Sequence, residues 1–426
     1  MKHITAATLL VAFVLSPHFA LAEAAWPGFR GANGCASTKA DKPPVSFTPN
    51  DALWKTELPP GSSSPVVWGE RIFLTAHSGE KSLEVLAVNR ADGKVAWRQA
   101  LAVEKLEPYF GSHGGSPAAS SCATDGAHVV SYFGSFGLVC HDFAGHELWR
   151  VAMPLPQLRD GFGTGTSPII HDGAVYLVRD EEGPGRGVFA FDVATGKPLW
   201  RKDRDGFHVS FGTPVVWDGS LAVIGDLRVK GYDLKTGEDR WVVRGTAAYP
   251  CTSPAVGDDG NLYIATWSNG SSNELNMPSF DQFLSQLDKD KDGKLSRAEV
   301  NVSGFRDFFD IQDKNHSGFI EREEWDEGLR FMARGKNVVL AIKPGGHGDI
   351  TDTHVAWTSE KGAPYVSSPL FYEGRLYLAK DGGLFTAFNA ATGKLLYEKQ
   401  RLGAEGEIYA SPVGAGGHIY LATYRG

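Results

Sequence analysis

Two absences narrow the function before any motif is considered. Apart from the N-terminus, the chain has no apolar run near the ~20 residues that a membrane-spanning helix needs. The net charge is −8, so the chain lacks the excess of Lys and Arg that a general nucleic-acid binder carries. We therefore expect no membrane span and no nucleic-acid partner.

Cysteine is scarce and scattered. The four cysteines are Cys35, Cys122, Cys140 and Cys251, and no two of them form a CxxC pair. This spacing argues against the usual zinc and thiol-redox motifs. An exported protein can form disulfides, but the sequence alone does not pair these residues. Buried free thiols are an equally good interpretation of each.

The first 22 residues have the organisation of a secretory signal peptide. Lys2 and His3 give a positive start, and an apolar run follows to Leu15. Ala20-Leu21-Ala22 is a small-x-small cleavage pattern ahead of Glu23. A membrane anchor is the alternative, but the run is short and Pro17 interrupts it. We predict cleavage after Ala22 and a soluble mature protein that is periplasmic or secreted.

Glycine and aromatic residues are abundant, with 51 glycines and 11% aromatics, which is typical of many short strands joined by tight turns. A Ser-Pro or Thr-Pro dipeptide recurs with its proline at 65, 117, 168, 214, 254, 369 and 412. The intervals are 52, 51, 46, 40, 115 and 43 residues. If about 67 residues (269–335) are an insertion, the long interval becomes about 48 and rejoins the series.

Each repeat has the same internal order. A short apolar strand follows the Ser-Pro, then a turn such as Trp217-Asp218-Gly219, a second strand, and an alternating third strand such as Val188–Asp192. A turn such as Ala194-Thr195-Gly196-Lys197 leads to a fourth strand. That strand carries an aromatic residue in six repeats: Trp97, Trp149, Trp200, Trp241, Trp357 or Tyr397.

Four short strands in about 45 residues, with glycine turns and one aromatic, indicate a β-propeller blade. The turn glycine supplies the positive φ of a tight hairpin, and the aromatic is expected to fill the space between neighbouring blades. A β-sandwich would not predict this fixed order. The expected fold class is therefore all-β, a β-propeller of four-stranded blades with a small α-helical insertion.

The two ends of the predicted ring are unusual. Residues 53–58 look like a fourth strand with no Ser-Pro unit before them. The unit that opens at Ser411-Pro412 has a second strand at 419–422 and no room for a third. We therefore expect seven or eight blades in the intact ring, with the last part truncated. The expected domains are 1–22 (signal peptide), 23–268 (first blades), 269–335 (insertion) and 336–426 (remaining blades).

Several of these motifs resemble those of a known protein family. The opening Trp26-Pro27-Gly28-Phe29-Arg30-Gly31, the Thr-Gly-Lys turns with their tryptophans, and Gly115-Ser116-Pro117 resemble the bacterial pyrroloquinoline-quinone-like β-propeller repeat proteins. The resemblance covers roughly residues 26–426. It implies a propeller of about eight blades and raises the question of a quinone cofactor.

Two twelve-residue stretches in the insertion, 288–299 and 313–324, match the EF-hand calcium-loop pattern. In the first, ligand positions 1, 3, 5, 7, 9 and 12 are filled by Asp288, Asp290, Asp292, Lys294 through its carbonyl, Ser296 through a water, and Glu299. In the second, they are filled by Asp313, Asn315, Ser317, Phe319 through its carbonyl, Glu321 through a water, and Glu324. Gly293 and Gly318 stand at position 6, where the loop turns sharply.

These loops predict two calcium sites, because Ca²⁺ prefers six to eight oxygen ligands. Loop one offers four acidic ligands and loop two offers two directly, so we expect loop one to bind more tightly. The flanks predict helices. Ser279 and Gln282 form a capping-box pattern, a middle helix is expected over 298–309 with Phe305, Phe308 and Phe309 buried, and a last helix over 322–332. A solvated acidic turn is the alternative for either loop alone.

Two functional classes remain open. The first is a calcium-stabilised binding or scaffold module that takes a protein or polymer partner on its propeller face. The second is a periplasmic pyrroloquinoline-quinone-dependent oxidoreductase. Enzymes of that type typically use adjacent cysteines, a stacking Trp and an Asp base, and this chain has no adjacent cysteines. His113 and Asp160, in glycine-rich turns on the insertion face, are weak pocket candidates that polar turn residues explain equally well. The binding module is the preferred interpretation.

Overall fold

The computed structural model describes residues 25–38, 42–109, 115–158, 161–274, 276–303, 305–306, 309–403 and 406–424. The predicted signal peptide lies outside these ranges. Within them, none of the helices combines the length and the apolar composition that crossing a membrane requires.

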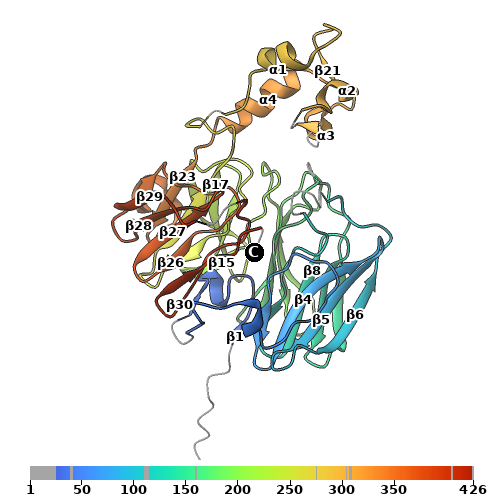
Figure 1. The fold of residues 1–426 in the computed structure, drawn as a ribbon, viewed down its shortest axis with the longest axis vertical. Coiled ribbons are helices and arrows are strands. Elements are labelled where there is room, and N and C mark those ends of the chain that lie inside the picture. The colour runs from blue at the N-terminus through green and yellow to red at the C-terminus, as the bar shows by residue number, and fades with distance from the viewer. Residues whose placement is uncertain are drawn as a thin grey trace, which may run out of the picture.

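The described strands form a ring of antiparallel sheets around a common centre (Figure 1). Six sheets contain four consecutive propeller strands. They are β3–β6 (Val66–Trp68, Arg71–Ser78, Ser82–Asn89, Val95–Ala102), β7–β10 (Ala123–Thr124, His128–Phe133, Gly137–Asp142, Glu147–Ala152), β11–β14 (Ile169–His171, Ala174–Arg179, Gly187–Asp192, Pro198–Lys202), β15–β18 (Val215–Trp217, Ser220–Gly225, Arg228–Asp233, Asp239–Arg244), β19, β20, β23 and β25 (Ala255–Val256, Leu262–Thr266, Val338–Ile342, Val355–Ser359), and β26–β29 (Leu370–Tyr372, Arg375–Lys380, Leu384–Asn389, Leu395–Arg401). The predicted propeller of four-stranded blades is confirmed.

Short elements complete the ring. A seventh sheet contains β30 (Val413–Ala415) and β31 (His418–Tyr420), and β2 (Ser37–Thr38) pairs with β30 in parallel. β1 (Ala25–Trp26) pairs with β3 of the first blade. β24 (Gly348–Asp349) adds in parallel to β18, and the remaining short helices are η1 (Ala32–Gly34), η2 (Pro49–Asp51) and α5 (Thr351–His354).

A belt of hydroxyl groups joins the inner edges of neighbouring blades. The backbone N–H of Ser64 donates to Ser121 Oγ at 2.9 Å, and that of Ser121 donates to Ser167 Oγ at 3.0 Å. The same bond repeats from blade to blade through Thr213, Ser253, Ser368 and Ser411. The recurring Ser or Thr therefore sets the register between blades. In the second blade this residue is Ser121, so the alignment on Ser116-Pro117 was wrong by five positions.

In four blades the tryptophan of the outer strand contacts the next blade, whereas Trp241 donates to Ser220 Oγ of its own blade at 3.2 Å. Trp149 donates from Nε1 to Val193 O at 2.9 Å, and an added Cβ at Gly196 would lie 2.6 Å from its ring. Trp97, Trp200 and Trp357 make the same pair of contacts with the Gly145, Gly237 and Gly393 turns. The turn glycine thus provides positive φ (67° at Gly196) and also room for an indole ring. The predicted wedge between blades is confirmed for these four tryptophans.

Each pair of neighbouring blades shares an apolar core. Between the third and fourth blades, for example, Val178 and Val188 pack with Val223 and Tyr232, all at most 1% exposed. Equivalent clusters lie at the other interfaces in order from the first blade to the seventh sheet. A single blade would leave these faces in water, so burial of the apolar strands requires the ring.

The chain between β1 and β2 crosses the centre of the ring. The side-chain amide of Asn33 pairs with the backbone of Val216 in β15. Its Nδ2 donates to Val216 O at 2.7 Å, and its Oδ1 accepts from Val216 N at 2.8 Å. Pro27 O accepts from Thr124 N, and Ala36 packs in the apolar cluster of the sixth blade. This segment therefore touches blades on opposite sides of the ring.

A helical insertion stands over one face of the disc (Figure 1). It joins β20 to β23 and contains α1 (Phe280–Leu287), β21 (Leu295–Ser296), α2 (Arg297–Val300), α3 (Phe309–Gln312), β22 (Phe319–Ile320) and α4 (Arg322–Met332). Entry after the second strand and exit before the third put it on the face that carries the links between blades, as the sequence predicts.

Two predicted elements differ from the structure. The middle helix expected over 298–309 is instead two short helices, because α2 ends at Val300 and α3 begins at Phe309. Residues 53–58 form no strand, since no third strand of their blade lies beside them in the described ranges. Trp54 still donates to Arg90 O at 2.8 Å and lies against Gly93, so it retains the blade-locking contact.

All four cysteines are free thiols. Cys122 and Cys140 are buried in the second blade, and Cys35 and Cys251 are half-buried. Burial raises the pKa of the Cys122 thiol to about 11 and that of the Cys140 thiol to about 12, so both are protonated at neutral pH. The sequence left open whether these cysteines form disulfides or are free thiols, and in the structure they are free thiols.

Candidate metal centre

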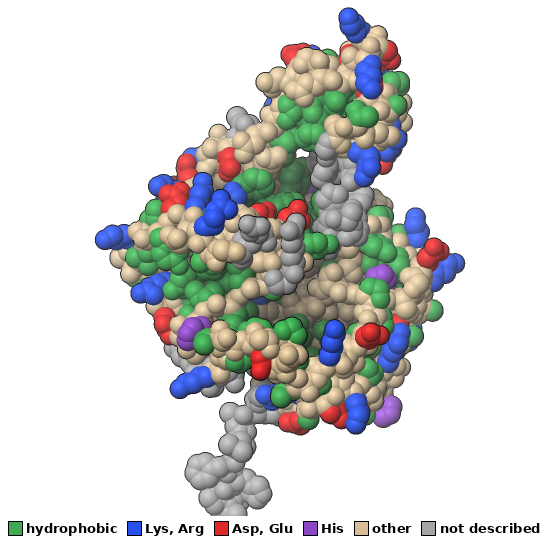
Figure 2. All heavy atoms as spheres, in the orientation of Figure 1, with side chains coloured by type: hydrophobic (Ala, Val, Ile, Leu, Met, Phe, Trp, Pro, Cys, Tyr) green, Lys and Arg blue, Asp and Glu red, His purple; other side chains and the backbone are tan. Residues whose placement is uncertain are grey.

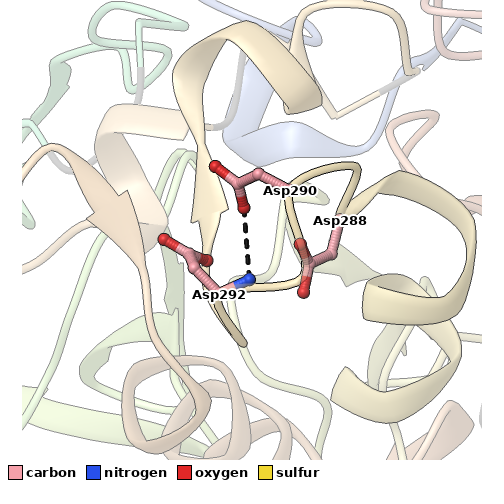
Figure 3. Close-up of side chains that lie close together, drawn as sticks. All are labelled: Asp288, Asp290 and Asp292. Carbon is pink, nitrogen blue, oxygen red and sulfur yellow. Dashed lines mark hydrogen bonds between the residues drawn. The ribbon is translucent and has the colours of Figure 1, made fainter.

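The first predicted loop brings three carboxylates together. The side-chain oxygens of Asp288, Asp290 and Asp292 lie within 4.8 Å of one another (Figure 3). Asp288 is half-buried and the other two are exposed. Three like charges this close repel, and a divalent cation between them would remove that repulsion.

The loop backbone holds these carboxylates in place. Asp288 accepts from Lys291 N at 2.7 Å and from Gly293 N at 3.1 Å, and Asp290 accepts from Asp292 N at 3.2 Å. Lys291 (φ 62°) and Gly293 (φ 81°) have left-handed backbone, which turns the chain around the shared space. These bonds hold the first half of the loop around the shared space.

Glu299 closes the first loop from α2. Its Oε1 accepts from Lys289 N at 2.8 Å, and its Oε2 accepts from Ser296 N at 2.9 Å and Ser296 Oγ at 2.7 Å. The Ser296 hydroxyl and these backbone amides lower the pKa of Glu299, which favours the carboxylate form. At 7% exposure Glu299 is a buried anion at position 12 of the loop.

The second predicted loop repeats this geometry. Asp313 accepts from Ser317 N and Gly318 N, both at 2.9 Å, and Glu324 accepts from Asn315 N at 3.1 Å and Glu321 N at 3.0 Å. Position 4 (His316, φ 57°) and position 6 (Gly318, φ 87°) are left-handed, as in the first loop. Asp313 and Glu324 are 4% and 7% exposed.

Position 9 differs between the loops. Glu321 Oε1 lies 2.5 Å from Lys294 Nζ, the residue at position 7 of the first loop. This ammonium group lowers the pKa of Glu321. The ion pair joins the two loops side by side, and it engages one oxygen of a residue predicted to bind a cation through water.

The loops are paired over a shared core. Leu295 of β21 pairs with Ile320 of β22, and both are fully buried. Phe283 stacks on Trp325 with ring centroids 4.6 Å apart, and Trp325 donates from Nε1 to Pro278 O. Phe309 is buried and Phe305 packs at the edge of this core, while Phe308 lies outside the described residues. The predicted Ser279–Gln282 capping box is present at the start of α1.

A polar neck and one aromatic contact join the insertion to the propeller. At the neck, Ser272 N donates to Gly335 O at 3.0 Å, and Asn273 and Asn337 are paired. At the end of α4, the Phe331 ring lies 4.7 Å from the ring of His208 and 5.4 Å from that of Tyr249. Phe331 therefore touches the third and fourth blades, seven residues after Glu324.

Beneath the insertion the propeller face holds buried charges that sequence reasoning missed. The Arg204 guanidinium donates to Asp180 at 2.6 and 2.9 Å and to Tyr232 OH at 2.7 Å. Arg179 pairs with Glu181 at 2.9 Å. The only signal was the run Arg179–Glu182 at the end of a strand, and the partner of Asp180, Arg204, comes from another part of the chain.

Two acids on this face have raised pKa values. Burial raises the pKa of Glu107 to about 7, although Thr164 donates to its Oε1 at 2.9 Å. Burial raises the pKa of Asp226 to about 6, although it accepts from the backbone N–H groups of His208 and Tyr249. The pocket candidates His113 and Asp160 lie outside the described residues.

Comparison with known proteins supports the repeat architecture. The family model described as outer membrane protein assembly factor BamB matches residues 81–270 and 281–426. Over 252 residues the chain is 25% identical to the serine/threonine-protein kinase AfsK of Streptomyces coelicolor, which covers 53% of this chain and 25% of that protein. The chain thus spans about a quarter of the length of this curated relative.

Solved structures share the fold at low identity. The quinohemoprotein alcohol dehydrogenase from Comamonas testosteroni is 12% identical, with a TM-score of 0.51 over 93% of this chain and 76% of that one. BamB from Moraxella catarrhalis is 13% identical, with a TM-score of 0.48 over 83% of this chain and 77% of that one. At these identities the first likeness concerns the fold alone.

Proposed function

Because the chain belongs to the family of the outer membrane protein assembly factor BamB, we propose that it is an exported, calcium-binding β-propeller that acts as a binding or scaffold module. Family membership bears out the resemblance to pyrroloquinoline-quinone-like propeller repeats. The proposal adds what the family does not supply, namely a pair of EF-hands at 269–335 that holds calcium.

One observation carries the calcium proposal. In both twelve-residue loops the acid at position 1 accepts from the backbone N–H at position 6, and the glutamate at position 12 accepts from the backbone N–H at position 9. An acidic turn on a protein surface has no reason to repeat this arrangement twice around one short β contact. The donor set is all oxygen, which suits a hard cation such as Ca²⁺.

The scaffold role rests on where the insertion lies. It rises from the face of the disc, and Figure 2 shows hydrophobic side chains gathered on the visible side of the insertion, above the propeller. Calcium would hold this module folded, so that the face beneath it and the module together present one surface to a protein or polymer partner. Export is part of the same proposal and rests on the predicted signal peptide.

Calorimetric titration with CaCl₂ tests the metal sites. We expect two sites in the wild type. Glu299→Gln and Glu324→Gln should each weaken one site roughly 10-fold or more, because even groups one step removed from a metal cost about 10–100-fold in affinity. The matched control is Glu323→Gln, which changes an exposed neighbour of Glu324. We expect the tighter site to be lost in Glu299→Gln.

Two outcomes would contradict the proposal. Absence of binding heat at millimolar calcium would remove the metal sites. A larger loss in Glu324→Gln would reverse the ranking of the loops. Adding pyrroloquinoline quinone distinguishes the oxidoreductase alternative from the scaffold role. If the quinone quenches tryptophan fluorescence and supports dye-linked oxidation of an alcohol or sugar, the protein is an enzyme rather than a scaffold.

A further inference from the structure

The hydroxyl belt of the propeller is interrupted at one place. It runs from Ser64 of the first blade to Ser411 at the seventh sheet, and each member donates its backbone N–H to the hydroxyl of the next. Between these two ends no such bond joins the described residues, so the Ser64 hydroxyl accepts none and the Ser411 N–H donates none. Both residues line one space of about 1010 Å³ between the seventh sheet and the first blade, which we call the seam cleft.

The walls of the seam cleft are largely apolar. Pro65 and Val67 of the first blade line one side, and Pro412 and Val413 of the seventh sheet line the other. Phe29, from the segment that crosses the ring, also lines the space. Its volume lies at the upper end of the usual range of about 300–1,000 Å³ for ligand pockets, which favours a segment of polypeptide over a compact molecule.

The first blade presents an unpartnered apolar face to the seam cleft. Ile72 of β4 is paired with Val67, so the two side chains lie on the same face of the sheet, and Leu74 follows on that face. The corresponding residues of the third blade, Val175 and Leu177, are fully buried against the second blade. Ile72 and Leu74 are only half-buried. The first blade thus leaves open a surface that the third blade buries against its neighbour.

The outer part of this interface is already occupied. Trp54 donates to Arg90 O and lies against Gly93, which are the contacts that an outer-strand tryptophan makes with the next blade elsewhere in the ring. The inner part, beside Ser64 and Val67, is open. It is bounded by β3 and β30, which are themselves inner strands. The open part therefore has the place of one inner strand.

We propose that the seam cleft binds an extended polypeptide strand of the repeat type, in which Ser-Pro or Thr-Pro is followed by apolar residues. The hydroxyl of this strand accepts from Ser411 N–H, and the N–H of the same residue donates to Ser64 Oγ, which continues the belt on both sides. Its apolar side chains are buried against Ile72 and Leu74. Burial of apolar surface supplies the affinity, and the two hydrogen bonds set the register.

The seam cleft goes beyond the proposed calcium-dependent scaffold. None of its lining residues belongs to the insertion, which leaves from the fifth blade. The partner surface proposed above lies on the face of the disc, whereas this cleft lies between two sheets of the ring. Strand binding and calcium binding can therefore each fail without the other.

Fluorescence anisotropy of a labelled peptide with the sequence of residues 165–172, the Ser-Pro strand of the third blade, tests the proposal. We expect saturable binding of one peptide to the full chain, and no comparable binding of the same residues in scrambled order. Ile72→Asp places a charge on the apolar face and should weaken binding roughly 10-fold or more. The matched control is Leu199→Asp, which changes an exposed residue of β14 outside the cleft and should bind as the wild type does.

The two hydrogen bonds are tested separately. Ser64→Ala removes the hydroxyl that accepts from the peptide, and Ser167→Ala within the peptide removes the hydroxyl that accepts from Ser411. Each change should weaken binding roughly 2- to 10-fold, as expected for one hydrogen bond between uncharged groups. Ser82→Ala, elsewhere in the first blade, is the control. The change within the peptide leaves the protein unaltered, so its result does not depend on the folding of a variant.

The proposal is overturned if the wild type does not bind the peptide, if the scrambled peptide binds equally well, or if Ile72→Asp, folded by its circular dichroism spectrum, binds as the wild type does. It is also overturned if neither Ser64→Ala nor the Ser167→Ala peptide weakens binding. Sedimentation of the protein alone should show a monomer. A dimer that Ile72→Asp dissociates would assign the cleft to a second copy of the chain instead.

Discussion

The propeller and the helical insertion are stabilised by different physical means. In the propeller, apolar strands pack blade against blade, and four outer-strand tryptophans and a belt of inner hydroxyls join one blade to the next. In the insertion, a small aromatic core supports two loops, and in the first loop three carboxylates lie within 4.8 Å of one another. The first arrangement needs no partner. The second leaves carboxylates that an added cation would stabilise, so the same chain combines a rigid ring with a module suited to a ligand.

The largest expected effect tests whether the tryptophans stabilise the ring. Trp149→Ala removes a buried indole, its hydrogen bond to Val193 O and its contact with Gly196. We expect a loss of about 3–5 kcal/mol in the free energy of unfolding, measured by urea denaturation. Trp54→Ala is the matched control, because Trp54 makes the same contacts from a half-buried position outside the strands. An equal loss in both variants would contradict the role of burial.

The second prediction tests whether the stability of the propeller depends on the ionisation of a buried acid, Glu107. Glu107 has its pKa raised from 4.5 to about 7 in the folded state, so the folded chain retains a proton that the unfolded chain has released. Stability therefore falls as pH rises from about 4.5 to about 7, by about 3 kcal/mol at about 1.36 kcal/mol per pH unit. Glu107→Gln imitates the protonated acid and should be more stable than the wild type at pH 8 but not below pH 4.5.

Urea unfolding at both pH values provides the measurement. Glu104→Gln, an exposed change three residues away, should leave the pH dependence as it is. Asp226 contributes in the same direction, since its pKa is also raised, so some pH dependence remains in Glu107→Gln. If the free energy of unfolding of Glu107→Gln depends on pH as that of the wild type does, the pKa of Glu107 is not raised in the folded protein.

The third prediction separates two roles of one turn glycine. Gly196 and Gly173 both have positive φ, 67° and 75°, so alanine at either position costs about 1–2 kcal/mol. An added Cβ meets the Trp149 ring at Gly196 and nothing within 4 Å at Gly173. Gly196→Ala should therefore lose about 1–3 kcal/mol more than Gly173→Ala in the same unfolding assay. Equal losses would mean that the indole moves aside freely.

The smallest expected effect concerns the junction between the two regions. Phe331→Ala removes the ring that lies against His208 and Tyr249. We expect about 1 kcal/mol less protection of the neck amides of Ser272 and Lys336 in hydrogen exchange, with the propeller core unchanged. Arg330→Ala, an exposed change on the same helix, is the control. Unchanged protection in Phe331→Ala would show that the neck alone positions the insertion.

Local patterns predicted much of this architecture. The blade order, the capping box at Ser279 and the bounds of α4 follow from dipeptides, turns and helical spacing that neighbouring residues determine. Calcium binding by the two loops remains a prediction, although their backbone geometry is the one that the spacing requires.

Features that depend on contacts between distant residues were not predicted. Ser116-Pro117 has the repeated dipeptide, but Ser121 joins the hydroxyl belt because its position relative to Ser64 and Ser167 is set by the adjacent blades. The pairing of Arg204 with Asp180, and the hydrogen bond from Arg30 to Pro369 O, depend on which segments meet in the fold. Residues 53–58 have a strand-like pattern, yet a strand requires a neighbour with which to pair.

The neck of the insertion has a consequence for how this chain tolerates change. Ser268 N donates to Asn337 Oδ1 at 2.7 Å, so the first and last residues of a long excursion stand as close as the two sides of a hairpin. The fifth blade thus closes locally, and the entropy cost of the excursion grows only slowly with its length. A segment of different length can therefore replace the insertion at this position at little entropic cost to the propeller.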